Sequence, residues 1–384
     1  MREIYMDHSA TTPVDGAVLE TMLPYFREKF GNASSIHQFG QEARNVVEEA
    51  RERVAGFIGA KSSEITFLSG GSEADNFALQ GLTSAYSGRG KHIITTSIEH
   101  PAIIETANYL EQNGISVTYL QPDKYGLIHP HQVEDAIRPE TFLISVMHVN
   151  NELGTMNPIG EIGAIAQNHG ILFHTDAVQA FGKLPIDVVA MNIDLLSASS
   201  HKIYGPKGVG ILFIKEGTQI DKLIHGAAHE RNRRAGTENV AGIVGFDKAV
   251  EICENVMTEE AARLTVLREY FWNKIETSIP DVIQNGHPTE KIPGILNMSF
   301  KGVEGESLLI SLDMKGIAAS SGSACSSGSN KPSHVLQSIR LAPELLNGTL
   351  RFSLGRSNTE DDIDYTVDAL SEIVERLRAM APVS

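Results

Sequence analysis

Short apolar runs alternate with helical patterns through the first two thirds of the chain, and several runs are apolar at consecutive positions. Consecutive apolar positions are typical of strands in a sheet that is covered on both faces. Apolar residues at helical spacing lie between the runs, as at Ala43, Val47 and Val54. The alternation predicts an α/β fold with a doubly wound, mostly parallel seven-stranded sheet and helices on both faces. The predicted strands are 64–68, 92–97, 117–120, 142–148, 171–175, 194–198 and 208–214.

The pattern changes after about residue 255. A long helical pattern over 259–279 leads away from the predicted sheet, and Pro280 is a plausible stop for it. Two further strands and two further helices follow, predicted at 295–300, 304–314, 350–354 and after 358–361. We therefore predict a large domain over 15–255 and a smaller α+β domain formed by 1–14 and 256–384.

Composition narrows the possible functions. The 384 residues carry a net charge of −16, which argues against general nucleic-acid binding because such binding usually needs a basic face. No stretch is long and apolar enough to span a bilayer, and the first residues lack an apolar signal core. The two cysteines, Cys253 and Cys325, form no CxxC motif, so a disulfide framework or structural zinc site has no support. We expect a cytoplasmic protein without a membrane partner.

Asp176 and Lys202 each follow an apolar strand candidate. Ligands of α/β sheets bind at the carboxyl ends of the strands. A lysine there can bond to an aldehyde, and a carboxylate there can hold the proton on a pyridine nitrogen, which is what pyridoxal phosphate chemistry requires. Each residue alone has a simpler explanation, since a lone lysine is usually solvated and a lone aspartate often caps a helix.

Other residues near strand ends suit the same cofactor. Ser69–Ser72 follows a strand, and Ser72 is expected to cap the next helix, so this turn would offer a phosphate its backbone N–H groups, a hydroxyl and a helix dipole. Gln179 would bond the ring hydroxyl, and His100 would stack on the ring and move protons. The alternatives stay open: a glycine turn with a cap, a surface amide and a helix-start histidine.

Two residues in the last third suit substrate chemistry. Cys325 lies in the Gly/Ser-rich stretch 319–329, where we expect an exposed, mobile thiol that carries a group between places. Cys253 lies in a helical pattern and is expected to be buried and inert. Arg351 interrupts an apolar strand pattern, and its guanidinium suits bidentate capture of a carboxylate; the alternative is a salt-bridge or edge-strand arginine.

Two further patterns are rejected. The glycines of 205–210 precede a predicted strand, whereas a dinucleotide motif should open a helix. His225 and His229 have the spacing of metal ligands on a helix, but their segment has no apolar period, so we expect a loop and no metal site.

Motifs along essentially the whole chain resemble those of the cysteine desulfurases, which are class V aminotransferase-like, fold-type-I pyridoxal phosphate enzymes. The SSGSAC motif resembles the group that supplies sulfur for iron–sulfur cluster assembly and tRNA thiolation. The matching motifs are DHSATTP (7–13), FGNASSIH (30–37), SGGSEADN (69–76), EHPAI (99–103), NNELGT (150–155), HTDAVQ (174–179), SSHKIYGPKGVG (199–210), RRAGTEN (233–239), SSGSACSSGS (320–329) and RFSLGR (351–356).

The resemblance implies a cofactor-binding role for a set of matching residues. Lys202 would hold pyridoxal phosphate covalently, and Thr237 would reach the phosphate bound by the neighbouring subunit of a homodimer. The residues that would bind the cofactor's phosphate or ring are Gly71, Ser72, His100, Asn151, Asp176, Gln179, Ser199 and His201. The family commonly has threonine at the position of Ser72, and the serine keeps the hydroxyl.

The resemblance also implies an activity. Asn151 and Arg351 would hold the carboxylate of L-cysteine, Lys202 and His100 would act in catalysis, and Cys325 would receive the sulfur as L-alanine forms. An iron–sulfur cluster scaffold or a tRNA-thiolating enzyme would then take the sulfur, and the resemblance leaves open whether Cys325 also ligates a cluster held by a partner. The alternatives are another pyridoxal phosphate enzyme, such as a selenocysteine lyase or an aminotransferase, and a sulfur-relay protein with a vestigial site.

Overall fold

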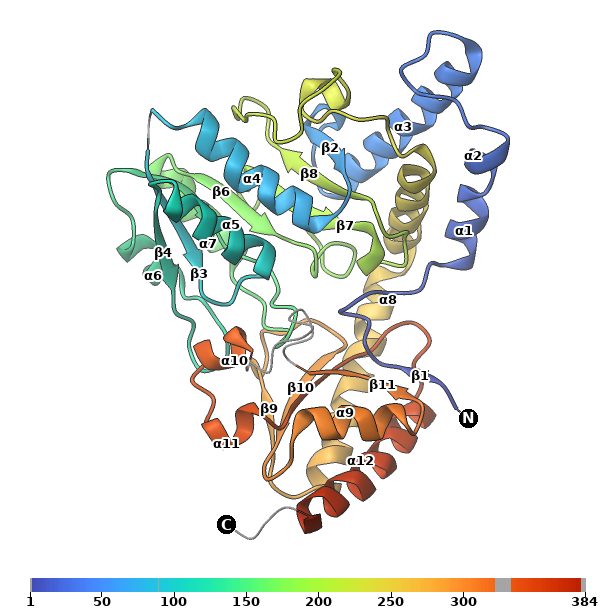
Figure 1. The fold of residues 1–384 in the computed structure, drawn as a ribbon, viewed down its shortest axis with the longest axis vertical. Helices are drawn as coiled ribbons and strands as arrows, with labels where there is room; N and C mark the ends of the chain where they lie inside the picture. The colour runs from blue at the N-terminus through green and yellow to red at the C-terminus, as the bar shows by residue number, and fades with distance from the viewer. Residues whose placement is uncertain (1, 89, 322–332, 381–384) are drawn as a thin grey trace.

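The computed structural model describes residues 2–88, 90–321 and 333–380 (Figure 1). Up to residue 214 the elements are β1 (Ile4–Tyr5), α1 (Gly16–Met22), α2 (Pro24–Arg27), α3 (Gln38–Phe57), η1 (Ser62–Glu64), β2 (Ile65–Leu68), α4 (Gly71–Ala85), β3 (His92–Thr96), α5 (Pro101–Gln112), β4 (Ser116–Leu120), α6 (Pro130–Asp135), β5 (Thr141–Ser145), α7 (Ile159–His169), β6 (Leu172–Asp176), β7 (Leu195–Ser199), η2 (Ser200–Lys202) and β8 (Gly210–Ile214). They are followed by η3 (Glu230–Asn232), α8 (Val240–Ser278), β9 (Val282–Asn285), β10 (Ile295–Phe300), α9 (Gly305–Asp313), β11 (Ile317–Ala318), β12 (Ser320–Ser321), α10 (His334–Ser338), α11 (Pro343–Leu346), β13 (Thr349–Ser353) and α12 (Glu360–Met380).

The larger sheet has seven strands in the order β2-β8-β7-β6-β5-β3-β4. Only β8 runs against its two neighbours, while the pairs β7/β6, β6/β5, β5/β3 and β3/β4 are parallel. The predicted mostly parallel α/β sheet is therefore confirmed, and each predicted strand corresponds to one of β2 to β8.

Helices cover both faces of this sheet, because neighbouring residues on a strand point to opposite sides. In β7, Leu195 packs into an apolar core with residues of α4 and α5, whereas Leu196 belongs to the core shared with α3, α7 and α8. Both side chains are fully buried. Burial on both faces explains why the strands are apolar at consecutive positions.

A second, smaller sheet lies at the other end of the molecule (Figure 1). Its strands are antiparallel in the order β12-β13-β10-β9, and β1 pairs separately with β11 in parallel. A separate apolar core joins Ile4 and Met6 to the second half of α8, to β10 and β13, and to α9 and α12. We propose on this basis that 1–14 and 256–384 form the smaller domain, with α8 crossing the boundary.

Two local expectations were wrong. Ser72 does not cap α4: the cap is Gly70, at φ +157°, and Ser72 lies within the first turn. A glycine is favoured at 70 because side chains rarely adopt this backbone conformation, whereas a Cβ there would meet only Ser199 Oγ, at 3.8 Å. The helix expected over 259–279 begins much earlier, at Val240, because the apolar run of 240–253 is helical and buried against the large sheet's helices.

No helix among the described residues combines the length and the apolar character needed to cross a membrane.

Candidate active site

A pocket of about 290 Å³ opens at the carboxyl ends of the central strands. Every residue predicted for the site lines it, apart from Thr237 and Cys325. The lining residues come from the ends of β6 and β7, from η2, from the starts of α4 and α5, and from β13 of the smaller sheet. The pocket therefore lies where the two sheets meet, and it needs both.

Lys202 lies in η2, directly after β7, and its side chain is half-buried. Its Nζ donates to the backbone oxygens of Ser9 at 2.5 Å and Ala10 at 2.7 Å. These acceptors belong to the amino-terminal segment, so the lysine is oriented by residues far away in sequence.

Asp176 ends β6 and lies buried in the pocket wall. Burial raises the pKa of its carboxyl, while the nearby His100 and Lys202 and a hydrogen bond from Val178 N, at 2.9 Å, lower it. The alternative that Asp176 only caps a helix does not account for a carboxylate held inside a pocket beside His100 and Lys202.

His100 is both the cap of α5 and a pocket residue, so both interpretations of it hold. Its Nδ1 accepts from Ala102 N at 3.1 Å, which leaves the proton of a neutral ring on Nε2. Burial lowers the pKa of His100, and Asp176 raises it. A mostly neutral imidazole thus faces the pocket near neutral pH.

The turn before α4 provides a position that suits a bound anion. Gly71, Ser72, Ser199 and His201 line both the main pocket and an adjoining open hollow that also contains Lys207. The first backbone N–H groups of a helix and its dipole favour a negative group at this position. A Cβ on Gly71 would lie 2.7 Å from the Val178 side chain, so the backbone there is tightly packed against the pocket wall.

Arg351 enters the pocket from the smaller sheet, where β13 is a central strand and not an edge. Its guanidinium donates to Asp7 Oδ1 at 2.8 Å and to Asn151 O at 2.9 Å, while its Nε is buried without a hydrogen-bond partner. The salt-bridge alternative is thus true of Arg351 as well, but an unpartnered donor in a pocket wall remains available for a carboxylate.

Gln179 is buried, so it is not a surface amide. Its Nε2 donates to Ser9 O at 2.9 Å, and its Oε1 accepts from Lys183 Nζ at 3.1 Å. Burial and the charge of Lys202 lower the pKa of His201 to about 4, so that imidazole is neutral at pH 7. The His201 Nδ1 lies 3.1 Å from Thr11 Oγ1.

One described residue that was predicted for the site, Thr237, is not brought to the pocket. Thr237 is exposed and lies outside the lining, and Cys325 lies outside the described residues. The rejected patterns behave as expected: 205–210 precedes β8, and His225 and His229 lie in loop positions before η3. Within the described ranges, no group of three or more His, Cys, Asp or Glu side chains is placed to hold a metal.

Several pocket residues were missed from the residue types alone. Ser9 and Ala10 contact Lys202, and the DHSATTP motif was the signal that could have identified them. Asp75 also lines the pocket and is almost fully buried. It lies four residues after Gly71, one helical turn along α4, which places both on one face. Burial and the neighbouring Asp176 raise the pKa of Asp75 well above its usual range.

The aminotransferase class-V family matches residues 4–366. The chain belongs to this family. A cysteine desulfurase IscS of Dictyoglomus turgidum is 51% identical over 381 residues, covering 99% of this chain and 97% of that protein. One from Methanosarcina thermophila is 50% identical over 383 residues, covering 100% and 95%. This full-length similarity places the chain among the cysteine desulfurases and does not favour the aminotransferase and selenocysteine lyase alternatives.

Solved structures agree. A NifS-like protein superimposes with a TM-score of 0.93 at 37% identity, covering 98% of this chain and 100% of that one. A structure described as SspA in complex with cysteine has a TM-score of 0.83 at 40% identity, covering 91% and 98%. The fold-type-I architecture is thereby confirmed.

Enzymes of this family depend on pyridoxal phosphate, and the pocket fits that group. An amine, a buried carboxylate and a helix amino terminus converge on a single cavity, as an aldehyde, a pyridine nitrogen and a phosphate would require. Lys202, Asp176 and the Gly71–Ser72 turn are the groups that would hold those three parts.

Proposed function

We propose that this cysteine desulfurase takes sulfur from L-cysteine, releases L-alanine and holds the sulfur as a persulfide on Cys325. The observation that carries the proposal is the convergence of Lys202, Asp176 and Arg351 in one pocket. A covalent anchor, an anionic partner for a pyridine ring and a carboxylate receptor suit an amino-acid substrate.

When bound, pyridoxal phosphate supplies an electron sink for the carbon atoms of the substrate. Arg351 and Asn151 would bind the substrate carboxylate. Lys202, which would hold the cofactor until substrate binds, would then take the Cα proton with its freed, neutral amine. His100 would exchange protons through Nε2, since its Nδ1 is occupied by Ala102 N.

The sulfur step is a displacement at the substrate sulfur. The Cys325 thiolate forms an S–S bond as the substrate C–S bond breaks, and the electron pair of that bond stays with the substrate carbon. That carbon takes up a proton and becomes the methyl group of alanine, so no external oxidant or reductant is needed. The thiolate is the reactive form, so attack requires loss of the Cys325 proton.

We further propose a homodimer. Apolar side chains are exposed along α1, α2 and the start of α3, where Phe30 and Phe39 stack at 5.8 Å. Contiguous exposed apolar surface of this kind marks an interaction site. Thr237 lies outside the pocket of its own chain, as expected if it serves the neighbouring subunit. The exposed residues are Leu19, Leu23, Phe26, Phe30, Ile36 and Phe39.

The sulfur acceptor we propose is an iron–sulfur cluster scaffold protein, a tRNA-thiolating enzyme or both, and the setting we propose is the cytoplasm. Incubation of persulfide-loaded enzyme with each purified acceptor, followed by measurement of sulfur on the acceptor, tests the first point. Sulfur that stays on the enzyme with both acceptors would contradict it.

The proposed activity is tested by incubating purified enzyme with cysteine and measuring alanine and sulfide. We expect Lys202→Ala to lose the visible absorption of the bound cofactor together with both products. Cys325→Ser should keep that absorption and still bind cysteine, but form no sulfide. The matched control is Cys253→Ala, since the Cys253 thiol is buried and burial raises its pKa to about 11. Full sulfide production by Cys325→Ser, or an extra sulfur atom found on Cys253, would reject the acceptor assignment.

A further inference from the structure

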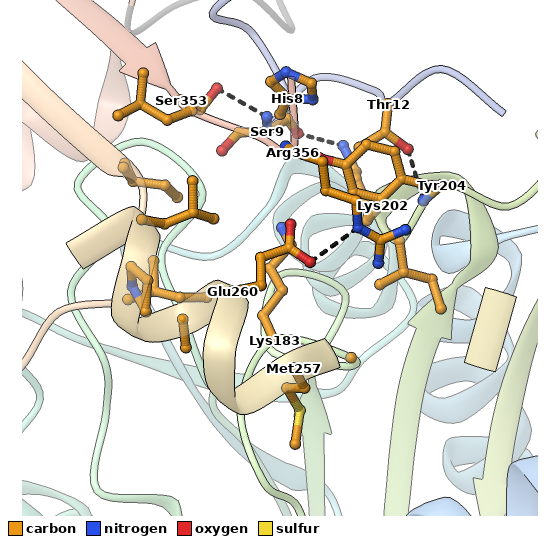
Figure 2. A pocket seen from close by; sticks show the side chains of 18 of the residues that line it. His8, Ser9, Thr12, Lys183, Lys202, Tyr204, Met257, Glu260, Ser353 and Arg356 are labelled. Atoms are coloured by element: carbon orange, nitrogen blue, oxygen red, sulfur yellow. Dashed lines mark hydrogen bonds and ion pairs between the residues drawn. The ribbon is translucent and has the colours of Figure 1, made fainter. Parts of the chain in front are cut away.

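A second cavity, of about 50 Å³, lies next to Lys202 and is distinct from the active-site pocket (Figure 2). Lys202 and Ser9 line both spaces. The cavity lies between α8, the amino-terminal segment and the loop after β6, and Lys183 on that loop lines it. A second lysine thus lies beside the lysine to which the cofactor would bind.

A chain of hydrogen bonds joins the two lysines. Lys183 Nζ donates to Gln179 Oε1 at 3.1 Å, and Gln179 Nε2 donates to Ser9 O at 2.9 Å. The same Ser9 oxygen accepts from Lys202 Nζ at 2.5 Å. An ammonium group can only donate, so Lys183 forces the oxygen of the Gln179 amide toward itself and the NH₂ group toward Ser9 and the pocket.

The charges around Lys183 do not neutralise it locally. Glu260 is the acidic group facing it, but the Glu260 carboxylate is bound by Arg356 Nε at 2.9 Å (Figure 2). The titratable groups that act on Lys183 or respond to it are Lys202, Glu260, Cys253, Arg351, His8 and His201. Those that act on or respond to Lys202 are, in addition, His100 and Asp176.

Burial, followed by the charge of Lys202, lowers the pKa of Lys183 to about 7. Part of its side chain remains accessible, yet desolvation is the largest effect on it. Because the repulsion between two ammonium groups is mutual, the charge of Lys183 lowers the pKa of Lys202 just as the charge of Lys202 lowers that of Lys183. A charge on either lysine therefore disfavours a charge on the other.

We propose that Lys183 is a positioning residue, which fixes the orientation of the Gln179 amide and, through its charge, favours the neutral, reactive amine of Lys202. The catalytic consequence of this role rests on the proposed function, whereas the effect on Lys202 itself does not. A neighbouring cation is a known means of freeing a reactive lysine amine.

The test compares Lys183→Met with Lys215→Met, a control on an exposed lysine at the end of the large sheet. In the full chain freed of cofactor, an amine-reactive acylating reagent labels only neutral amines, and peptide mass spectrometry follows labelling of Lys202 against pH. We expect the midpoint to rise by about one pH unit in Lys183→Met, which is roughly a tenfold slower labelling at a fixed lower pH. In the cofactor-loaded enzyme, the pH midpoint of the colour change should rise in the same direction.

Lys183→Arg restores a charged donor and should return both midpoints toward the wild-type values. Midpoints in Lys183→Met equal to those of Lys215→Met would overturn the proposal, as would an equal rise in Lys183→Arg and Lys183→Met. If Lys183→Met does not fold, Lys183→Gln provides the uncharged variant. Because labelling is read without substrate, a chain that labelled as expected but released no alanine would refute the proposed function and leave this inference standing.

Discussion

Glu99 provides a test of how burial sets the charge of a group beside the active site. It lies between β3 and α5 and is almost fully buried, with its Oε1 accepting from Thr96 Oγ1 at 2.8 Å and Met147 N at 2.9 Å. Its Oε2 is buried without a hydrogen-bond partner. Desolvation, with a smaller contribution from the nearby Asp176, raises the pKa of Glu99 to about 8 despite the two hydrogen bonds, which lower it. The side chain is therefore mostly protonated at pH 7.

A pKa raised on folding makes stability depend on pH. The contribution of Glu99 is fully present below its ordinary pKa of 4.5 and is lost as pH rises through about 8. Over that range the free energy of unfolding falls by about 1.4 kcal/mol per pH unit. Glu99→Gln has no proton to lose and keeps the Oε1 acceptor. We therefore expect this variant to match the wild type at pH 5 and to exceed it by about 3 kcal/mol at pH 7.

The assay is thermal unfolding of wild type and Glu99→Gln at pH 5, 6, 7 and 8. For a chain of 384 residues, about 3 kcal/mol corresponds to a difference in melting temperature of about 4 °C. Glu105→Gln, which changes an exposed carboxylate on α5, is the control and should leave the difference from wild type independent of pH. A melting-temperature difference for Glu99→Gln that stays constant from pH 5 to 8 would refute the assignment of a buried, protonated carboxyl.

Three further outcomes are expected. Arg351→Gln should raise KM for cysteine about tenfold or more in steady-state assays of alanine release, because it removes a charged donor for the carboxylate; an unchanged KM would contradict that role. Glu230→Gln should destabilise the protein by about 3 kcal/mol in urea unfolding, since it removes the buried carboxylate that lies 2.6 Å from the Arg51 guanidinium and leaves only the partly exposed Glu48, at 3.1 Å; a loss no larger than that expected for an exposed ion pair would contradict the prediction. Asp176→Asn should retain cofactor but lower kcat about a hundredfold in the same alanine assay, through loss of the charge opposite the ring; full activity would refute the assignment.

The sequence predicted the large sheet well because both of its faces are buried. Strands such as β5 and β7 have apolar side chains at neighbouring positions, and every residue in them is buried. Apolar residues at consecutive positions did not reveal the first part of α8, since a helix that is buried on several sides shows the same pattern as a buried strand. The cap of α4 was misassigned because Ser72 has a suitable side chain, whereas Gly70 is favoured by its backbone conformation, which has no side-chain signature in the sequence.

The candidate site was predictable wherever a residue follows a strand. Asp176, Lys202 and His100 each do, and a parallel sheet brings such positions to one edge. The contacts between distant segments were beyond reach of local patterns. Gln179 and Lys183 are only four residues apart, but their link to Lys202 runs through Ser9 and depends on how the amino-terminal segment crosses the site.

The path of the amino terminus links catalysis to the integrity of the smaller sheet. Its first residues pair with β11 through β1, and the smaller sheet itself is bound to them by the hydrogen bond from Ser353 N to Met6 O, at 2.7 Å. A few residues later, the backbone oxygens of Ser9 and Ala10 accept hydrogen bonds from Lys202 Nζ, and Thr12 N donates to His201 O at 3.0 Å. Weaker pairing of β1 with β11 would therefore also loosen the contacts of Ser9 and Ala10 with Lys202. Proteolytic removal of the first dozen residues would abolish these contacts and leave the strands of the large sheet intact.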